Sequence, residues 1–409
     1  MDTDSTNRRD DGRYADVAII GAGPIGLELA VALKRAGIDS LHFDAKQIGY
    51  TISWFPPQTR FFSSNERIAI AGVPLQTPDQ GKCTREQYLA YLRSVVLEFD
   101  LRVNTYEPVV GIERTDRIAD GGGFVLTTHP AGGRRTYRAR RLILATGGTD
   151  HPRRLGVPGE DLPHVSHYFD DPHKYFRRRV LIVGGKNSAV EAALRCHHAG
   201  ANVALSYRRA ALPARSIKYW LLPEINSLIE SGKMRAYFRS QPTAIAPDRV
   251  TLGPSGFDEE EGSRFRIQGS GGDAVQAASG KGQGTARQPE DEPRSGGGPS
   301  SLNPEPRTLN PLTVPADFVL ALVGYEQDNR LLTLAGVDLA GSCGAPAFEE
   351  RTMETNVPGV YVAGTAVGGT QDKYTVFIEN CHVHVGRIVA ALTGATPPAA
   401  PMPLAQPES

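Results

Sequence analysis

The chain has 409 residues, enough for two or three domains that each bury a core of their own. Its 45 basic and 45 acidic side chains cancel, so the charge balance gives no sign of a nucleic-acid or anionic-membrane partner. The four cysteines stand far apart and form neither a disulfide framework nor a metal site, which predicts a protein of the reducing cytoplasm without a bound metal.

The first predicted unit spans residues 16–46 and has the order strand, glycine turn, helix, strand. An apolar strand over 17–20 leads into a G-x-G-x-x-G turn, and the helix after it ends at Gly37. The next strand, 41–43, ends at Asp44, where a ribose hydroxyl needs an acceptor. This pattern predicts a dinucleotide site whose phosphates rest on the helix N-terminus. The candidate contacts are Gly21, Gly23, Pro24, Gly26, Asp44 and Lys46.

Residues 47–72 lack helical or strand periodicity and predict a long loop. Aromatic side chains in it, such as Trp54, Phe61 and Phe62, are candidates for the wall of a flavin pocket, and ordinary packing under a loop explains each of them equally well. Residues 84–98 predict an amphipathic helix capped by Thr84, and residues 101–103 and 124–127 predict strands.

A second copy of the first unit begins with a strand over residues 180–183. Gly21 and Gly37 are 16 positions apart, and so are Gly184 and Gly200, so the two helices have the same predicted length. The position that matches Asp44 is Tyr207, followed by two arginines that suit a 2′-phosphate and favour NADPH over NADH. Lys186 replaces the second glycine and is expected to bind the pyrophosphate as a point charge. The candidate contacts are Gly184, Gly185, Lys186, Asn187, Ser188, Arg208 and Arg209.

Glycine-ended strands also mark where the chain leaves and re-enters the first unit. The strand 142–144 runs into Thr146 and Gly147, a pattern typical of the exit from the first domain of two-dinucleotide flavoproteins. A later strand, 360–363, runs into Gly364 and Thr365, where such proteins often have a glycine-acid pair at the flavin. These four residues are candidate FAD contacts, and a closing helix is predicted over 377–392.

Between these parts, residues 254–310 are rich in Gly, Ser, Pro, Glu and Gln and predict a disordered insertion. The strands 250–252 and 317–323 are predicted to form the hairpin that carries it. Residues 1–14 and 396–409 are predicted tails. The first tail contains no apolar secretion signal, and the glycines and Glu28 within the apolar run 17–33 make it a poor membrane span, so we expect a soluble cytoplasmic protein.

Several motifs together resemble one family, the YpdA-type bacillithiol disulfide reductases of the thioredoxin-reductase-like flavoproteins. They are GAGPIG, FPPQTRFFSS, ATGGTDHP, GVPGEDLP, VLIVGGKNSAVEAAL, SIKYWLLPE, METNVPGVYVAG and FIEN. The resemblance covers about residues 15–254 and 312–392, and the family shares Lys186. It implies FAD in the first domain, NADPH in the second and a small-molecule disulfide as electron acceptor, with Lys218 of the SIKYWLLPE motif as a further candidate NADPH contact. We also expect a homo-oligomer.

The fold implied is α/β, with two Rossmann-like dinucleotide-binding domains of the three-layer, thioredoxin-reductase-like type. We expect a discontinuous FAD-binding domain over residues 15–153 and 312–395 and an NADPH-binding domain over 154–311.

Two departures concern the thiols. The C-x-x-C of thioredoxin reductases is absent, and Ile25 occupies the position where some YpdA-type sequences have a cysteine near the flavin. Of the cysteines present, Cys381 at the closing helix is the best candidate for a reactive thiol, although an inert buried thiol is the simpler interpretation for each of them. The alternative is transfer from the flavin to the acceptor without a protein thiol.

The absence of redox cysteines keeps other functions open. One is an NADPH reductase of ferredoxin, a quinone or another electron acceptor, and another is a non-enzymatic redox-sensing flavoprotein. A flavin monooxygenase is disfavoured, because Pro158 and Glu160 stand where its signature has Phe and Gly.

Overall fold

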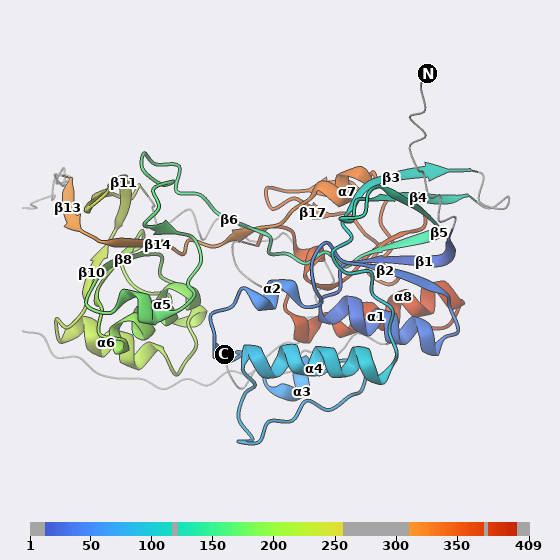
Figure 1. Cartoon of the computed structure of the whole chain (residues 1–409), viewed down its shortest axis with the longest axis horizontal. Helices are drawn as coiled ribbons and strands as arrows, with labels where there is room; N and C mark the ends of the chain where they lie inside the picture. The colour runs from blue at the N-terminus through green and yellow to red at the C-terminus, as the bar shows by residue number, and fades with distance from the viewer. Residues whose placement is uncertain (1–12, 117–121, 257–310, 372–374, 399–409) are drawn as a thin grey trace, which may run out of the picture.

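The computed structural model describes residues 13–116, 122–256, 311–371 and 375–398. Most of the expected tails and of the expected insertion therefore lies outside the described residues. The described chain forms two lobes, which we call the first unit and the second unit, joined by a narrow two-stranded connection (Figure 1).

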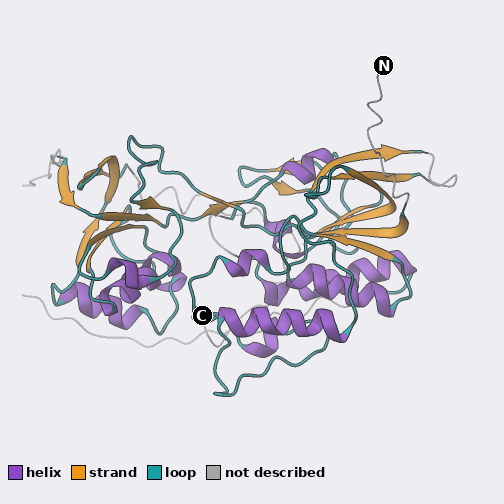
Figure 2. Cartoon of the chain, viewed as in Figure 1, coloured by secondary structure: helices purple, strands orange, loops and turns teal. Residues whose placement is uncertain are grey.

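The first unit is built on one sheet with the strand order β2-β1-β5-β4-β3. The long strand β5 pairs with β1 on one side; on its other side its first part pairs with β4 and its last part with β18. Helix α1 packs against β1, β2, α4 and α8, so the strands are covered by helices on one face, as the α/β prediction requires (Figure 2). The strands are β1 Tyr14–Ile20, β2 Ser40–Phe43, β3 Val109–Thr115, β4 Gly123–Thr128, β5 Arg135–Leu144 and β18 Val360–Val362.

The helices of the first unit confirm part of the prediction and correct part of it. Helix α4 begins after Thr84, whose hydroxyl accepts a hydrogen bond from the Gln87 N–H while the Gln87 side chain accepts one from the Thr84 N–H. Short helices α2 and α3 lie within the segment that was expected to be only a loop. The helices are α1 Pro24–Arg35, α2 Tyr50–Ser53, α3 Asn65–Ile68, α4 Arg85–Glu98, α7 Arg330–Leu334 and α8 His382–Thr393.

Two further predictions in this unit were wrong, and one strand was missed. Residues 101–103 are not a strand, and β3 was missed because its alternation of apolar and polar residues is broken by a register shift between Val109 and Gly111. The closing helix begins at His382 rather than at Phe377, because the single 3₁₀ turn Ile378–Asn380 precedes it.

The second unit contains a parallel sheet with the order β10-β9-β8-β14-β7 and an antiparallel sheet with the order β11-β12-β13. Helix α5 packs on β8, β9 and α6. The elements are β7 Val165–Ser166, β8 Arg179–Val183, α5 Asn187–His198, β9 Asn202–Tyr207, α6 Leu222–Glu230, β10 Arg235–Phe238, β11 Ser240–Ala246, β12 Arg249–Pro254, β13 Leu312–Pro315 and β14 Phe318–Ala321.

Strand pairing corrects the expected hairpin and the expected boundary at residue 312. Strand β12 pairs with β13, whereas β14 leaves the hairpin and inserts between β8 and β7. Both β13 and β14 therefore belong to the second unit, because their backbone hydrogen bonds are made there. The chain returns to the first unit through β15 Tyr325–Glu326, which pairs antiparallel with β6 His151–Pro152.

One further pair of short strands follows, β16 Leu339–Ala340 and β17 Ala345–Pro346. Within the described ranges, no helix has the length and apolar character needed to cross a membrane.

Candidate functional site

The glycine turn after β1 has the geometry of a dinucleotide cradle. Gly21 adopts φ +109°, and a Cβ on it would lie 2.3 Å from the Ala145 carbonyl oxygen. A Cβ on Gly26 would lie 2.0 Å from the Gly21 oxygen, so these two glycines let β1, β5 and α1 approach one another. Gly23, the N-cap of α1, faces open space and has no side-chain cap. This opening at a helix N-terminus, next to Pro24, fits an anionic diphosphate.

The acidic residue at the end of β2 is tied to this turn. Asp44 accepts hydrogen bonds from the Ala22 N–H at 2.6 Å and from the Lys46 N–H at 2.8 Å. Burial raises the pKa of the Asp44 carboxyl, while these two N–H groups oppose the shift. Two bonded oxygens still leave lone pairs for a ribose hydroxyl.

A buried histidine beneath the turn was missed by the sequence analysis. His42 Nε2 lies 2.9 Å from the Gly21 carbonyl oxygen, and burial lowers the pKa of His42 to about 4 although that bond opposes the shift. The ring is therefore neutral at pH 7 and donates through Nε2. Its place in a strand of a parallel sheet, whose residues are buried on both faces, was the available signal for its burial.

The segments that follow β5 and β18 lie next to each other beside the first glycine turn. Because these strands are parallel neighbours, the segments after them meet at one edge of the sheet. The Gly148 N–H donates to the Thr365 hydroxyl at 2.9 Å, which brings the Thr146-Gly147 segment next to Gly364 and Thr365. Gly364 in turn lies against the Ile25 side chain. The sequence-predicted FAD residues after β1, β5 and β18 thus come together.

Phe62 lies apart from this group. Its ring stacks on Trp220 of the second unit, with ring centroids 6.0 Å apart. The Lys82 ammonium lies 4.9 Å from the Trp220 centroid and donates to the Phe62 carbonyl. Phe62 is therefore part of the contact between the two units.

The glycine turn after β8 repeats the geometry of the first turn, but different residues contact it and Lys186 replaces its second glycine. A Cβ on Gly184 would lie 2.4 Å from the Leu322 oxygen, and one on Gly185 would lie 2.5 Å from the Tyr207 ring. Lys186 is the N-cap of α5 and supplies no side-chain cap to it. The turn therefore leaves the N-terminus of α5, with Asn187 and Ser188, available to a diphosphate. Arg208 and Arg209 follow the neighbouring parallel strand β9.

Lys218, the further NADPH contact that the resemblance implies, lines the same side of the second unit as Asn187 and Ser188. It is buried, and its ammonium donates to Glu191 Oε2 at 2.8 Å and to the Arg60 carbonyl of the first unit at 2.9 Å. Its backbone N–H donates to Asn187 Oδ1 at 2.6 Å. Lys218 therefore bonds groups of both units at their interface. A bond from its ammonium to NADPH would require some of these contacts to rearrange.

A cavity of about 220 Å³ lies between the units. Aromatic side chains of the first unit form one wall, and the first turns of α5 form the other. The lining residues include Trp54, Phe61, Phe62, Thr149, Asn187, Ser188, Glu191, Lys218 and Tyr325.

The cysteines do not contribute a reactive thiol to this cavity. All four lie within the described residues, none lines the cavity, and Cys83, Cys196 and Cys381 are buried. Burial raises the pKa of the Cys83 and Cys196 thiols to about 12, and burial raises that of Cys381 well above its usual range. A thiolate is the nucleophile in disulfide exchange, so these three thiols are poorly suited to it.

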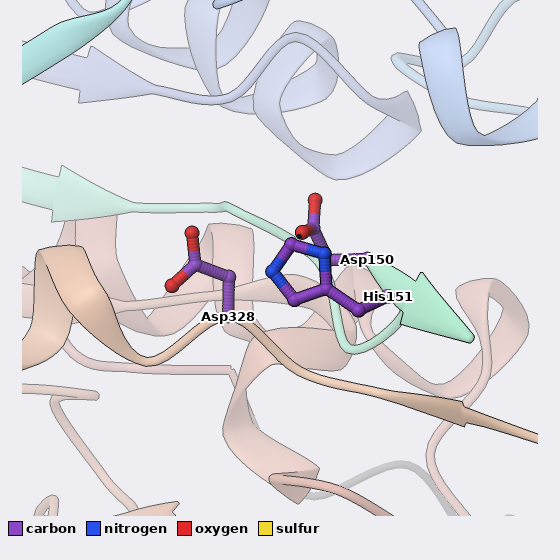
Figure 3. Close-up of side chains that lie close together, drawn as sticks. All are labelled: Asp150, His151 and Asp328. Carbon is purple, nitrogen blue, oxygen red and sulfur yellow. Dashed lines mark ion pairs between the residues drawn. The ribbon is translucent and has the colours of Figure 1, made fainter. Parts of the chain in front are cut away.

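One group of possible metal ligands lies at the connection between the units. His151 begins β6, Asp150 precedes it and Asp328 follows β15, with ligand atoms within 4.8 Å of one another (Figure 3). His151 Nε2 already lies 2.9 Å from Asp150 Oδ2, and Asp328 accepts a hydrogen bond from the Arg330 N–H. Because these side chains are partly solvent-accessible and have partners, the grouping supports no metal assignment.

The fold and the two cradles define a flavoprotein oxidoreductase with two dinucleotide-binding units, a class whose cofactors are FAD and NADPH. The sequence model of the pyridine nucleotide-disulphide oxidoreductase family matches residues 18–261. The chain belongs to this family and, within it, to the Bdr (YpdA) group, which confirms the resemblance seen in the motifs.

Three similar proteins show the extent of the relationship. Bacilliredoxin reductase Bdr of Bacillus subtilis is 35% identical over 374 residues, which cover 91% of this chain and 96% of that protein. The structure of bacillithiol disulfide reductase Bdr (YpdA) from Staphylococcus aureus has a TM-score of 0.74 at 31% identity and covers 93% of this chain and 99% of its own. A ferredoxin–NADP reductase of Ignicoccus hospitalis is 28% identical over 222 residues, which cover 53% of this chain and 64% of that protein.

Proposed function

We propose that the protein is an NADPH-dependent flavoprotein that reduces a low-molecular-weight disulfide of the bacillithiol disulfide type without a redox-active cysteine pair. The observation that carries the proposal is the presence of two dinucleotide cradles in a chain that is similar over nearly its whole length to Bdr proteins. The reaction takes up one proton: NADPH, H⁺ and the disulfide give NADP⁺ and two thiols.

In this proposal the first unit binds FAD and the second binds NADPH. Gly21, Gly23 and Gly26 place the FAD diphosphate at the start of α1, Asp44 accepts from its ribose, and Thr365 helps to shape the edge of the sheet next to it. Arg208 and Arg209 pair with the 2′-phosphate of NADPH, a group that NADH lacks. The bound flavin supplies the two-electron chemistry that links hydride donor and disulfide.

The lining of the interunit cavity supports an acceptor that reaches the cofactor directly. No cysteine lines the cavity, and the buried thiols of Cys83, Cys196 and Cys381 are held in the protonated form. Reduction through a protein thiol, as in enzymes with a C-x-x-C, therefore has no suitable residue among them.

An anaerobic experiment tests the proposal. The purified protein, reconstituted with FAD, is expected to lose its flavin absorbance when NADPH is added and to regain it rapidly with bacillithiol disulfide. Cystine and oxidised glutathione serve as controls for disulfide selectivity. Reoxidation no faster than with buffer alone would reject the disulfide as acceptor.

The partial similarity to a ferredoxin–NADP reductase makes electron transfer to ferredoxin a second candidate. The same reduced protein is mixed with ferredoxin in place of the disulfide. Faster reoxidation by ferredoxin than by any of the three disulfides would favour this second function.

A further inference from the structure

One loop of the first unit, residues 57–62, makes several contacts with the second unit. This loop is fixed to its own unit by backbone hydrogen bonds, because the Phe61 N–H donates to the Cys83 carbonyl and the Arg85 N–H donates to the Thr59 carbonyl. The Phe61 ring also packs on the Tyr88 ring of α4, with centroids 4.7 Å apart. The loop is therefore a rigid part of the first unit.

Two cationic side chains of the second unit reach carbonyls of this loop. Lys218 Nζ donates to the Arg60 carbonyl at 2.9 Å, and Arg195 Nη2 donates to the Pro57 carbonyl at 2.7 Å. Hydrogen bonds from charged donors are stronger than neutral ones, and the Lys218 contact is shielded from water. Phe62 stacked on Trp220 adds an apolar contact next to them.

Both cations are coupled to α5, the helix that carries the second cradle. Arg195 projects from α5 itself, one turn after Glu191, which pairs with Lys218. The Lys218 backbone N–H holds Asn187, the first residue of α5. The loop 57–62 thus bonds α5 directly at Arg195, and it bonds Lys218, which in turn contacts Asn187 and Glu191 of the same helix.

We infer that Lys218 and Arg195 are positioning residues that hold the NADPH-binding helix α5 against the FAD unit in the arrangement in which hydride passes from NADPH to the flavin. NADPH loses a hydride and becomes NADP⁺, and the flavin gains that hydride. The cavity shared by Ser188 and the aromatic loop lies at this junction, so a small shift of α5 changes its shape. This inference rests on the proposed function and reassigns Lys218 from NADPH binding to alignment of the units.

The test separates the rate of flavin reduction from the affinity for NADPH. Lys218→Met and Arg195→Met remove the charge and keep an unbranched chain of similar bulk. Because displacement of reacting groups by about 1 Å costs up to about 100-fold in rate, we expect the limiting rate of flavin reduction in stopped-flow experiments to fall by about 10-fold to 100-fold. The dissociation constant for NADPH should change by less than about threefold.

A second measurement tests the contact between the loop and α5 independently of enzyme activity. Hydrogen–deuterium exchange of the FAD-loaded protein should be faster in peptides that cover residues 57–62 and α5 in both variants. Lys174→Met is the matched control, because Lys174 pairs with Asp170 on the surface of the second unit, and it should behave like the wild type in both measurements. Lys218→Arg should restore part of the rate.

Three results would overturn the inference. Wild-type reduction rates in both Met variants would show that the contacts are not needed for alignment. A raised NADPH dissociation constant at an unchanged rate would return Lys218 to a binding role, and faster reduction would mean that the contacts hold a resting arrangement. If Lys218→Met does not fold because Glu191 loses its buried partner, Arg195→Met still tests the inference, because it leaves the Lys218–Glu191 pair intact. Failure of NADPH to reduce the wild-type flavin would instead reject the proposed function.

Discussion

Replacement of Gly23 by alanine separates the ligand role of the first glycine turn from its structural role. Gly23 has φ −73°, which alanine adopts without strain, and an added Cβ would meet nothing within 4 Å. Alanine is a poorer N-cap than glycine, but it also restricts the unfolded chain. Because these effects oppose each other, the stability of the apoprotein should change by no more than about 0.5 kcal/mol.

The expected effect on FAD is much larger. In the proposed site the diphosphate approaches the backbone at Gly23, and a methyl group there would hold it beyond hydrogen-bond distance. One hydrogen bond to a charged group contributes about 1.5–3 kcal/mol. Its loss corresponds to a decrease in FAD affinity of about 10-fold to 100-fold.

The assay compares this variant with Gly37→Ala, at the other end of the same helix. Gly37 also faces open space, but its φ of +70° is left-handed, so alanine should destabilise the apoprotein by about 1–2 kcal/mol. FAD affinity, measured by quenching of flavin fluorescence, should be normal for this variant. FAD affinity within about threefold of wild type in Gly23→Ala would refute the proposed position of the diphosphate.

Three further predictions follow from the second cradle, a long-range histidine pair and the cysteines. Replacing both Arg208 and Arg209 with Ala should raise the KM for NADPH about 10-fold or more and leave that for NADH nearly unchanged; equal changes would contradict the 2′-phosphate role. For His382, burial acts to lower the pKa, but the carboxylate of Glu28 at 2.7 Å and the Arg67 carbonyl outweigh it and raise the pKa above 6.5. The stabilisation that protonated His382 provides is therefore complete below pH 6.5 and is lost as the pH rises through the raised pKa of His382. Denaturant titrations at several pH values should show that the free energy of unfolding of the wild type declines over this pH range. The decline should be smaller for His382→Gln. Cys381→Ala should keep most of the disulfide reductase rate in a steady-state assay, because its buried thiol is protonated; loss of the rate with normal FAD content would assign that thiol a role.

Local patterns in the sequence were sufficient for the parts of the site that depend on short segments. The turn at Gly21 requires a left-handed residue between a strand and a helix, and the cap at Thr84 involves residues three positions apart. The equal spacing of the two glycine pairs identified the repeated unit, and the chemistry of Asp44 and of the Arg208–Arg209 pair distinguished the two units. Each of these signals is contained within one supersecondary element.

Contacts between distant segments needed the tertiary structure. Glu28 and His382 are 354 positions apart, and Lys218 meets the Arg60 carbonyl across 158 positions, so no local period reveals either pair. The apolar composition of β14 fits a strand paired with β12 in a hairpin as well as a strand inside the parallel sheet. Only its backbone hydrogen bonds to β8 and β7 show that it belongs to the parallel sheet.

The sequence by itself determined that two dinucleotide units are present and which residues form their turns, because glycine geometry and helix periodicity are local properties of the chain. Only the tertiary structure decided what lies between the units, because a side chain such as Lys218 takes its role from the groups that folding brings within hydrogen-bond distance. Its motif predicted a cofactor contact, and folding adds contacts with Glu191, Asn187 and a carbonyl of the other unit.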